Sequence, residues 1–237
     1  MPYSLEEYIP EMIYIVEYPI HYSGIDLFSR MTLVRLDDGK LWVHSPCQLD
    51  AQLKTEIDRL GKVAYIIAPG NFHHLFVSDF QKYYPDAETF LCPGLDKKRQ
   101  DLKFDWILGN HPDPRWNSEF YQVVIQGTRI ISEVVFVHIN TRTLILVDLL
   151  ENIGDDYTHE AGLLLQFWWK AVFKMWNNPK AAPEYQLGWG DKEVVKKGME
   201  IILSWDFDRI ILAHGNLIES NAKAILRKAW ENVLQSH

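Results

Sequence analysis

Short apolar runs separated by polar turns, the pattern of β-strands and their connections, fill much of the first 94 residues of the chain. The strands expected in this part are residues 12–22, 31–36, 41–46, 63–69 and 88–94. Asp38 and Gly39 separate the second strand from the third, and an Asp-Gly step between two such stretches is a strong hairpin signal. The stretch VAYIIAP is almost wholly apolar, which indicates a strand buried on both faces.

Other segments repeat their apolar residues every three or four positions, as amphipathic helices do. In one of them Leu53 and Ile57 share a stripe, and Gly61 follows as a helix stop. Helices are predicted at 49–60, 74–84, 192–203 and 221–234, and further strands at 121–127, 132–138, 143–148 and 208–215. Sheet with interspersed helices in both halves predicts a layered α/β or α+β protein, with residues 1–237 forming a single domain.

The most apolar stretch is AGLLLQFWWKAVFKMW, residues 161–176. It contains Lys170 and Lys174 and is shorter than the roughly 20 residues that a membrane-spanning helix requires. We therefore predict a helix in a protein without membrane contact. Its aromatic residues are too many for one narrow stripe, so the segment is expected to form either an apolar wall beside a ligand or a homodimer contact.

Composition narrows the classes of function. The net charge of −8 argues against nucleic-acid binding, which requires a basic face. Cys47 and Cys92 are the only cysteines, too few for a disulfide scaffold or a cysteine-based zinc module. The first residues are acidic and lack the pattern of a secretory signal, so a cytoplasmic protein is expected.

Side chains that bind metals follow three of the apolar strands. His73 and His74 come after 63–69, Asp148 ends TLILVD, and His214 ends RIILAH. In layered α/β folds, ligand sites gather beyond the carboxyl ends of buried strands. Imidazole and carboxylate groups bind zinc, iron or manganese. The sequence therefore predicts a metal site at one edge of a sheet.

Four segments carry a resemblance to a known family: RMTLVRLDDGKLWVHSP, IIAPGNFHHLFVSDFQKYYPDAETFLCPGL, EVVFVHINTRTLILVDLLEN and IILAHG. In order and spacing they resemble the metallo-β-lactamase superfamily, and within it a branch of domains of unknown function. The resemblance implies an αββα sandwich, in which two mixed β-sheets pack face to face and helices cover both outer faces.

The superfamily motif His-x-His-x-Asp-His is degenerate here. Aligning its final Asp-His pair with His73-His74 puts Pro69 and Asn71 in place of the first two histidines. The resemblance makes Glu133 the counterpart of the next ligand, alongside Asp148 and His214. It implies one ion bound by the second half of the site, with His74 favoured over His73 as the direct ligand. A carboxylate-rich second site that includes Glu133 remains the alternative, and it would suit iron or manganese rather than zinc.

The leading hypothesis is a metal-dependent hydrolase, in which Asp148 or Glu133 acts as general base. Phe72, Trp168 and Trp169 are predicted to contact the substrate in an apolar pocket, which favours a small ester, lactone or thioester. Arg142 is expected to pair either with a substrate carboxylate or with an acidic side chain of the protein. The alternatives are a catalytically degenerate binding or scaffold protein and an iron-binding redox protein.

Overall fold

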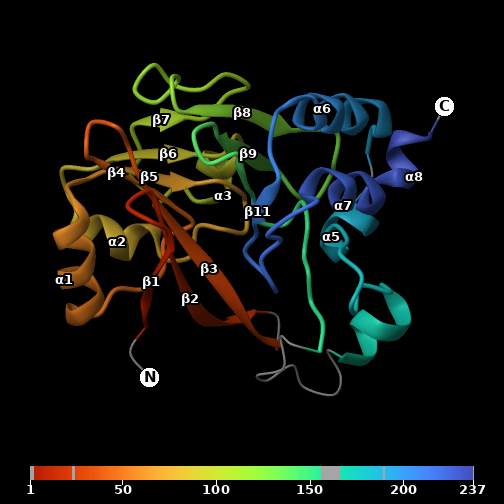
Figure 1. The fold of residues 1–237 in the computed structure, drawn as a ribbon, viewed down its shortest axis with the longest axis horizontal. Helices are drawn as coiled ribbons and strands as arrows, with labels where there is room; N and C mark the ends of the chain where they lie inside the picture. The colour runs from red at the N-terminus through yellow and green to blue at the C-terminus, as the bar shows by residue number, and fades with distance from the viewer. Residues whose placement is uncertain (1–2, 23–24, 156–165, 189, 237) are drawn as a thin grey trace.

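Two β-sheets face each other in the computed structural model, which describes residues 3–22, 25–155, 166–188 and 190–236 (Figure 1). Over these residues the larger sheet contains, in order, β1 (Leu5–Ile9), β2 (Ile13–Tyr22), β3 (Ile25–Arg35), β4 (Leu41–His44), β5 (Val63–Ala68), β6 (Glu88–Leu91) and β7 (Trp106–Ile107). The smaller sheet has the order β11 (Arg209–Ile211), β10 (Thr143–Ile145), β9 (Glu133–His138) and β8 (Phe120–Ile125). Each sheet combines parallel and antiparallel pairs, so both are mixed, as predicted.

Helices cover the outer face of each sheet. The described helices are α1 (Ala51–Leu60), α2 (Val77–Tyr83), α3 (Leu95–Lys98), the π-helical turn η1 (Trp168–Val172), α5 (Pro183–Leu187), α6 (Lys192–Ser204), α7 (Ala222–Ala229) and α8 (Glu231–Leu234). Helices α1 and α2 lie against the larger sheet, and α6 and α7 against the smaller one (Figure 1). Among the described residues, no helix has the length and apolar character needed to cross a bilayer.

Alternating side chains of the strands build three separate apolar layers. Ile66 of β5 packs toward α1 and α2, whereas its neighbour Ile67 points into the space between the sheets. In β9, Val135 faces α6 and α7, and Phe136 faces the other sheet. Because both faces of these strands are buried, their sequences are continuous apolar runs, and the αββα sandwich follows directly from that pattern.

Aromatic rings fill the layer between the sheets. The ring centroid of Trp42 lies 4.7 Å from that of Phe120 and 4.9 Å from that of Phe136. Trp42, Phe120 and Phe136 are fully buried. Tilted and edge-to-face pairs of this kind contribute about 0.5–1.5 kcal/mol each beyond the area they bury. This layer fixes the spacing of the two sheets and therefore of the loops at their ends.

The structure differs from the expected elements in several places. It adds the edge strands β1 and β7, which are short and partly exposed. The predicted last helix is split at Trp230, whose indole N–H donates to the Leu149 carbonyl at 3.0 Å. The predicted helix 161–176 is found over residues 166–172, where two α-helical residues lead into the π-helical η1, and it ends before residue 173; residues 161–165 lie outside the described residues.

Candidate metal centre

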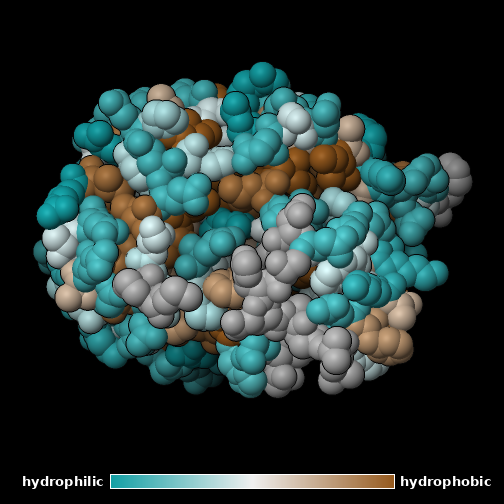
Figure 2. Space-filling model, turned by 60° about the horizontal axis from the view of Figure 1, so that its bottom comes forward, coloured by the Kyte–Doolittle hydropathy of each residue, from teal (hydrophilic) through white to brown (hydrophobic). Residues whose placement is uncertain are grey.

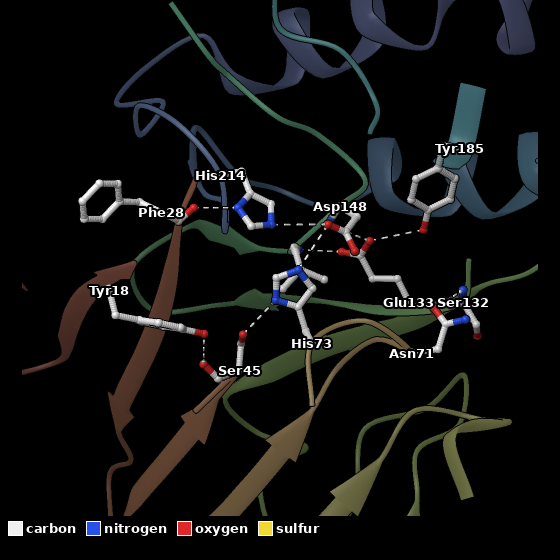
Figure 3. A network of polar contacts seen from close by, with 11 residues as sticks. Tyr18, Phe28, Ser45, Asn71, His73, Ser132, Glu133, Asp148, Tyr185 and His214 are labelled. Carbon is white, nitrogen blue, oxygen red and sulfur yellow. Dashed lines mark hydrogen bonds and ion pairs between the residues drawn. The ribbon is translucent and has the colours of Figure 1, made fainter. Parts of the chain in front are cut away.

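Three loops bring His73, Asp148 and His214 together, as the strand ends predicted. Strands β10 and β11 are parallel neighbours, so the loops after them leave the sheet at the same edge. Asp148 follows β10 and His214 follows β11, while His73 comes from the loop after β5 in the facing sheet. Figure 3 shows both imidazole rings pointing toward the Asp148 carboxylate.

The distances within this group suit a single ion. The Nε2 atom of His73 lies 3.2 Å from Oδ1 of Asp148, and Nε2 of His214 lies 3.7 Å from the same oxygen. One ligand atom from each residue falls within 4.8 Å of the others, and all three side chains are buried. Bonds of about 2.0–2.2 Å from nitrogen and oxygen to a central zinc ion are compatible with this spacing.

Hydrogen bonds on the far side of each ring hold its orientation. Nδ1 of His214 donates to the Phe28 carbonyl oxygen at 2.7 Å, so in the neutral ring the lone pair is on Nε2. Nδ1 of His73 lies 3.0 Å from the hydroxyl oxygen of Ser45. A second hydrogen bond of this kind is typical of metal-binding histidines, because it fixes both the tautomer and the direction of the ring.

The protonation states of the group favour a cation. Burial lowers the pKa of His214 to about 4, so its ring is neutral at physiological pH. Burial by itself would raise the pKa of Asp148, but the neighbouring His73 and His214 rings hold this pKa below its usual value. A neutral His214 ring and an ionised Asp148 carboxylate are the forms in which these side chains bind metals.

The preference for His74 over His73 is corrected by the structure. Nδ1 of His74 lies 2.9 Å from a guanidinium nitrogen of Arg99, and burial lowers the pKa of His74 to about 4. The guanidinium can only donate, so Nδ1 of His74 is the acceptor and is not directed at Asp148. Two adjacent residues of one tight turn point their side chains in different directions, and here His73 is the one that joins the group.

Glu133 does not lie where a ligand or a general base would be needed. Its carboxylate is fully buried and accepts hydrogen bonds from the backbone N–H groups of Val147 (2.6 Å) and Asp148 (3.1 Å). The Tyr185 hydroxyl donates to it at 3.2 Å. Burial and the nearby Asp148 charge raise the pKa of Glu133. The predicted ligand and base is therefore a support that positions the backbone of Asp148 (Figure 3).

The loop that carries His73 is fastened to the start of β9. The Asn71 side chain donates to the Ile130 carbonyl at 2.9 Å and accepts from the Ser132 N–H at 3.1 Å. The Pro69 carbonyl accepts from the Val134 N–H at 2.7 Å. Pro69 and Asn71 occupy the positions of the first two histidines of the degenerate motif. Here they anchor the loop instead of offering ligand atoms.

A cavity of about 340 Å³ opens beside the three residues. Phe72, Trp168 and Trp169 line it, in agreement with the prediction of an apolar wall. Phe167 and Trp168 are about half exposed, whereas Trp169 is buried against Ile153. On the face shown in Figure 2, hydrophobic residues gather in a band between hydrophilic ones.

Arg142 lies outside this cavity. Its guanidinium pairs with Asp206 at 2.8 Å on the exposed surface, so of the two roles expected for Arg142, the pairing with an acidic side chain is found. Two glutamates in the cavity wall add to the predicted set. Glu151 follows Asp148 closely in the sequence, whereas Glu184 lies in the first turn of the distant helix α5 and carries no sequence signal of its own.

Comparison with known proteins agrees with the fold. A family model described as "Domain of unknown function (DUF4336)" matches residues 10–166. The DIM-1 metallo-β-lactamase has a TM-score of 0.67 with 11% identity, and the match covers 98% of each chain. A metallo-β-lactamase from Pontibacter korlensis has a TM-score of 0.65 with 10% identity, and the match covers 99% of this chain and 100% of that one. The metallo-β-lactamase FIM-1 from Pseudomonas aeruginosa, solved in a mono-zinc form, has a TM-score of 0.67 with 8% identity. That match covers 100% of this chain and 98% of FIM-1. No curated protein matches the chain. These likenesses confirm the metallo-β-lactamase fold.

Proposed function

The chain belongs to the DUF4336 family, and from its site we propose that it is a metal-dependent hydrolase acting on a small ester, lactone or thioester. One observation carries the proposal: Nε2 of His73, Nε2 of His214 and a carboxylate oxygen of Asp148 converge at the wall of an apolar cavity. A fixed set of ligands facing a space for a small molecule is what hydrolysis by a divalent ion requires.

The residues present fit a divalent ion. Two imidazoles and one carboxylate form a donor set suited to zinc, and also to iron or manganese. Both rings are oriented through Nδ1, by Ser45 and by the Phe28 carbonyl. Pro69 and Asn71 replace two motif histidines, which supports one ion rather than two. The structural neighbour FIM-1 was solved in a mono-zinc form.

The side chains divide the work between them. His73, Asp148 and His214 would hold a divalent ion, which would supply an activated water molecule and polarise the substrate carbonyl. The Glu133 carboxylate accepts hydrogen bonds from the backbone N–H groups of Val147 and Asp148 and so keeps the Asp148 backbone in place. The second carboxylate oxygen of Asp148 is the proposed acceptor of the proton that the attacking water releases. Trp169 and Phe72 limit the water that surrounds the substrate.

A scaffold or binding protein of the same fold is the second candidate. The observation that favours it is the replacement of two motif histidines by Pro69 and Asn71, residues that fasten a loop. Such a protein would keep the cavity without turnover. Activity and metal content separate the two candidates.

The test is hydrolysis of p-nitrophenyl acetate, a γ-lactone and an acyl thioester by the metal-stripped protein, before and after reloading with zinc, iron(II) or manganese. We expect turnover only in a metal-loaded form, and a loss of about a hundredfold or more in Asp148→Asn. Asp206→Asn is the matched control, because Asp206 lies on the exposed surface and pairs with Arg142. Turnover by the stripped protein, or by metal-loaded Asp148→Asn, at the rate of the metal-loaded parent would refute the proposal.

A further inference from the structure

Among the described residues that line the cavity, the carboxylates face no lysine or arginine. The carboxylates in this wall belong to Asp148, Glu151 and Glu184. The charged ends of Arg30, Lys98 and Arg99 all have partners among the described residues. Arg30 pairs with Glu17 and donates to the Gly215 carbonyl beside His214. Lys98 donates to the Asn71 carbonyl and lies 4.3 Å from the Phe72 ring centroid, and Arg99 pairs with Asp101 and His74. A substrate carboxylate or phosphate would therefore meet like charge in this wall.

Glu151 is a buried acid with no countercharge among the residues that the structure describes. The residue is 5% exposed. Among the described residues, its carboxylate accepts one hydrogen bond, from the Trp169 indole N–H at 3.3 Å. No ion pair involves Glu151 or Glu184 among those residues. Burial, followed by the charges of Asp148 and Glu184, raises the pKa of Glu151 well above its usual value. Burying an acid in this way is costly unless something compensates for it.

Aromatic rings stand beside these carboxylates. Trp169 donates to Glu151, and Trp168 and Phe173 line the same cavity. Phe72 and Tyr18 add two more rings to the lining. The faces of such rings attract ammonium groups, and a box of aromatic rings with a nearby carboxylate is a common way to bind them.

We propose that the cavity recognises a ligand with an ammonium group on a small apolar body. The ammonium group lies beside Glu151 and Glu184 against Trp168 and Trp169. The acyl carbonyl of the same molecule faces His73, Asp148 and His214, and this second statement rests on the proposed hydrolase function. A cation beside Glu151 favours the ionised form of this carboxylate, and the resulting ion pair compensates for its burial.

The experiment compares binding of three molecules of similar size: acetylcholine, its uncharged isostere 3,3-dimethylbutyl acetate, and the anion monomethyl succinate. Quenching of tryptophan fluorescence reports occupancy, because Trp168 and Trp169 line the cavity. Titrations are run on the metal-stripped and the zinc-loaded protein. We expect acetylcholine to bind at least about tenfold more tightly than the isostere, and the anion most weakly.

Variants locate the effect. Glu151→Gln is expected to bring the ratio of acetylcholine to isostere affinity close to one, and Glu184→Gln, at a less buried position, to lower it. Glu119→Gln is the matched control, since Glu119 is also 5% exposed but binds the Asp37 N–H away from the cavity. If Glu151→Gln does not fold, Glu184→Gln alone carries the comparison.

Several results would overturn the inference. Equal affinity for acetylcholine and its isostere, or tighter binding of the anion, contradicts it. So does a second equivalent of zinc in the parent that Glu151→Gln loses, because Glu151 would then be a metal ligand. A preference for acetylcholine without any turnover leaves the inference standing and removes the hydrolase function instead.

Discussion

Replacing Asn71 by alanine tests whether the altered motif positions hold His73 in place. The substitution removes two hydrogen bonds between the Asn71 side chain and the start of β9, to the Ile130 carbonyl and from the Ser132 N–H. At about 0.5–1.5 kcal/mol for each bond, the free energy of unfolding is expected to fall by about 1–3 kcal/mol. The backbone contacts of Asn71 and Pro69 remain, so the fold is expected to persist.

The same substitution is expected to weaken metal binding, because the loop that carries His73 loses its side-chain anchors. Outer contacts of this kind typically change metal affinity by about 10–100-fold. Urea unfolding of the metal-free protein measures the first effect, and titration with zinc against a competing chelator measures the second. Asn71→His restores the motif residue but not the anchors, so it is expected to behave like the alanine variant.

Asn110→Ala is the control for the general cost of such a change. Its side chain also bonds a strand, accepting from the Val124 N–H at 3.1 Å, but far from His73 along the chain and outside the cavity wall. It is expected to lower stability without changing zinc affinity. If Asn71→Ala keeps the zinc affinity of the parent, or if Asn110→Ala loses as much, the positioning role assigned to Asn71 is wrong.

Three further predictions follow from the packing and the charges. Phe136→Ala removes a buried ring that packs against Trp42 and Phe120, and urea unfolding is expected to show a loss of about 3–5 kcal/mol in the free energy of unfolding. His138 is buried with its pKa lowered to about 4, so the unfolded chain takes up the proton first and stability falls as pH drops from about 6.5 toward 4. His138→Gln is expected to reduce the fall in the free energy of unfolding between pH 7 and pH 5 by about 2 kcal/mol. Urea unfolding at the two pH values measures this difference. Arg142→Ala is expected to leave turnover and zinc affinity unchanged, and a clear fall in either would return Arg142 to the site.

Much of the fold was readable from the sequence, because both faces of the central strands are buried. Apolar runs such as Val63–Ala68 marked these strands, and Asp38-Gly39 marked a hairpin, where the Leu36 N–H donates to the Lys40 carbonyl at 2.9 Å. Ligand-type residues at three strand ends predicted where the site lies. Edge strands such as β7, with two exposed residues, carry no comparable pattern.

The finer assignment of the site could not be read in the same way. His73 and His74 are adjacent in a turn, and only the three-dimensional path of that turn decides which ring faces Asp148. Glu133 looks like a ligand, but its partners are backbone N–H groups 14 and 15 residues further along the chain. Glu184 reaches the cavity from a helix far along the chain, and no local pattern predicts such a contact.

The most direct measurement is the zinc content of the purified protein and of three single variants, each checked for its fold by circular dichroism. The parent is expected to bind one equivalent, and His73→Ala and His214→Ala to bind less than about a tenth of that. His74→Ala is expected to stay close to the parent, because its ring nitrogen contacts Arg99 rather than Asp148. A parent that binds no metal, or a His74 variant that loses it while the His73 variant keeps it, would contradict the assigned metal centre.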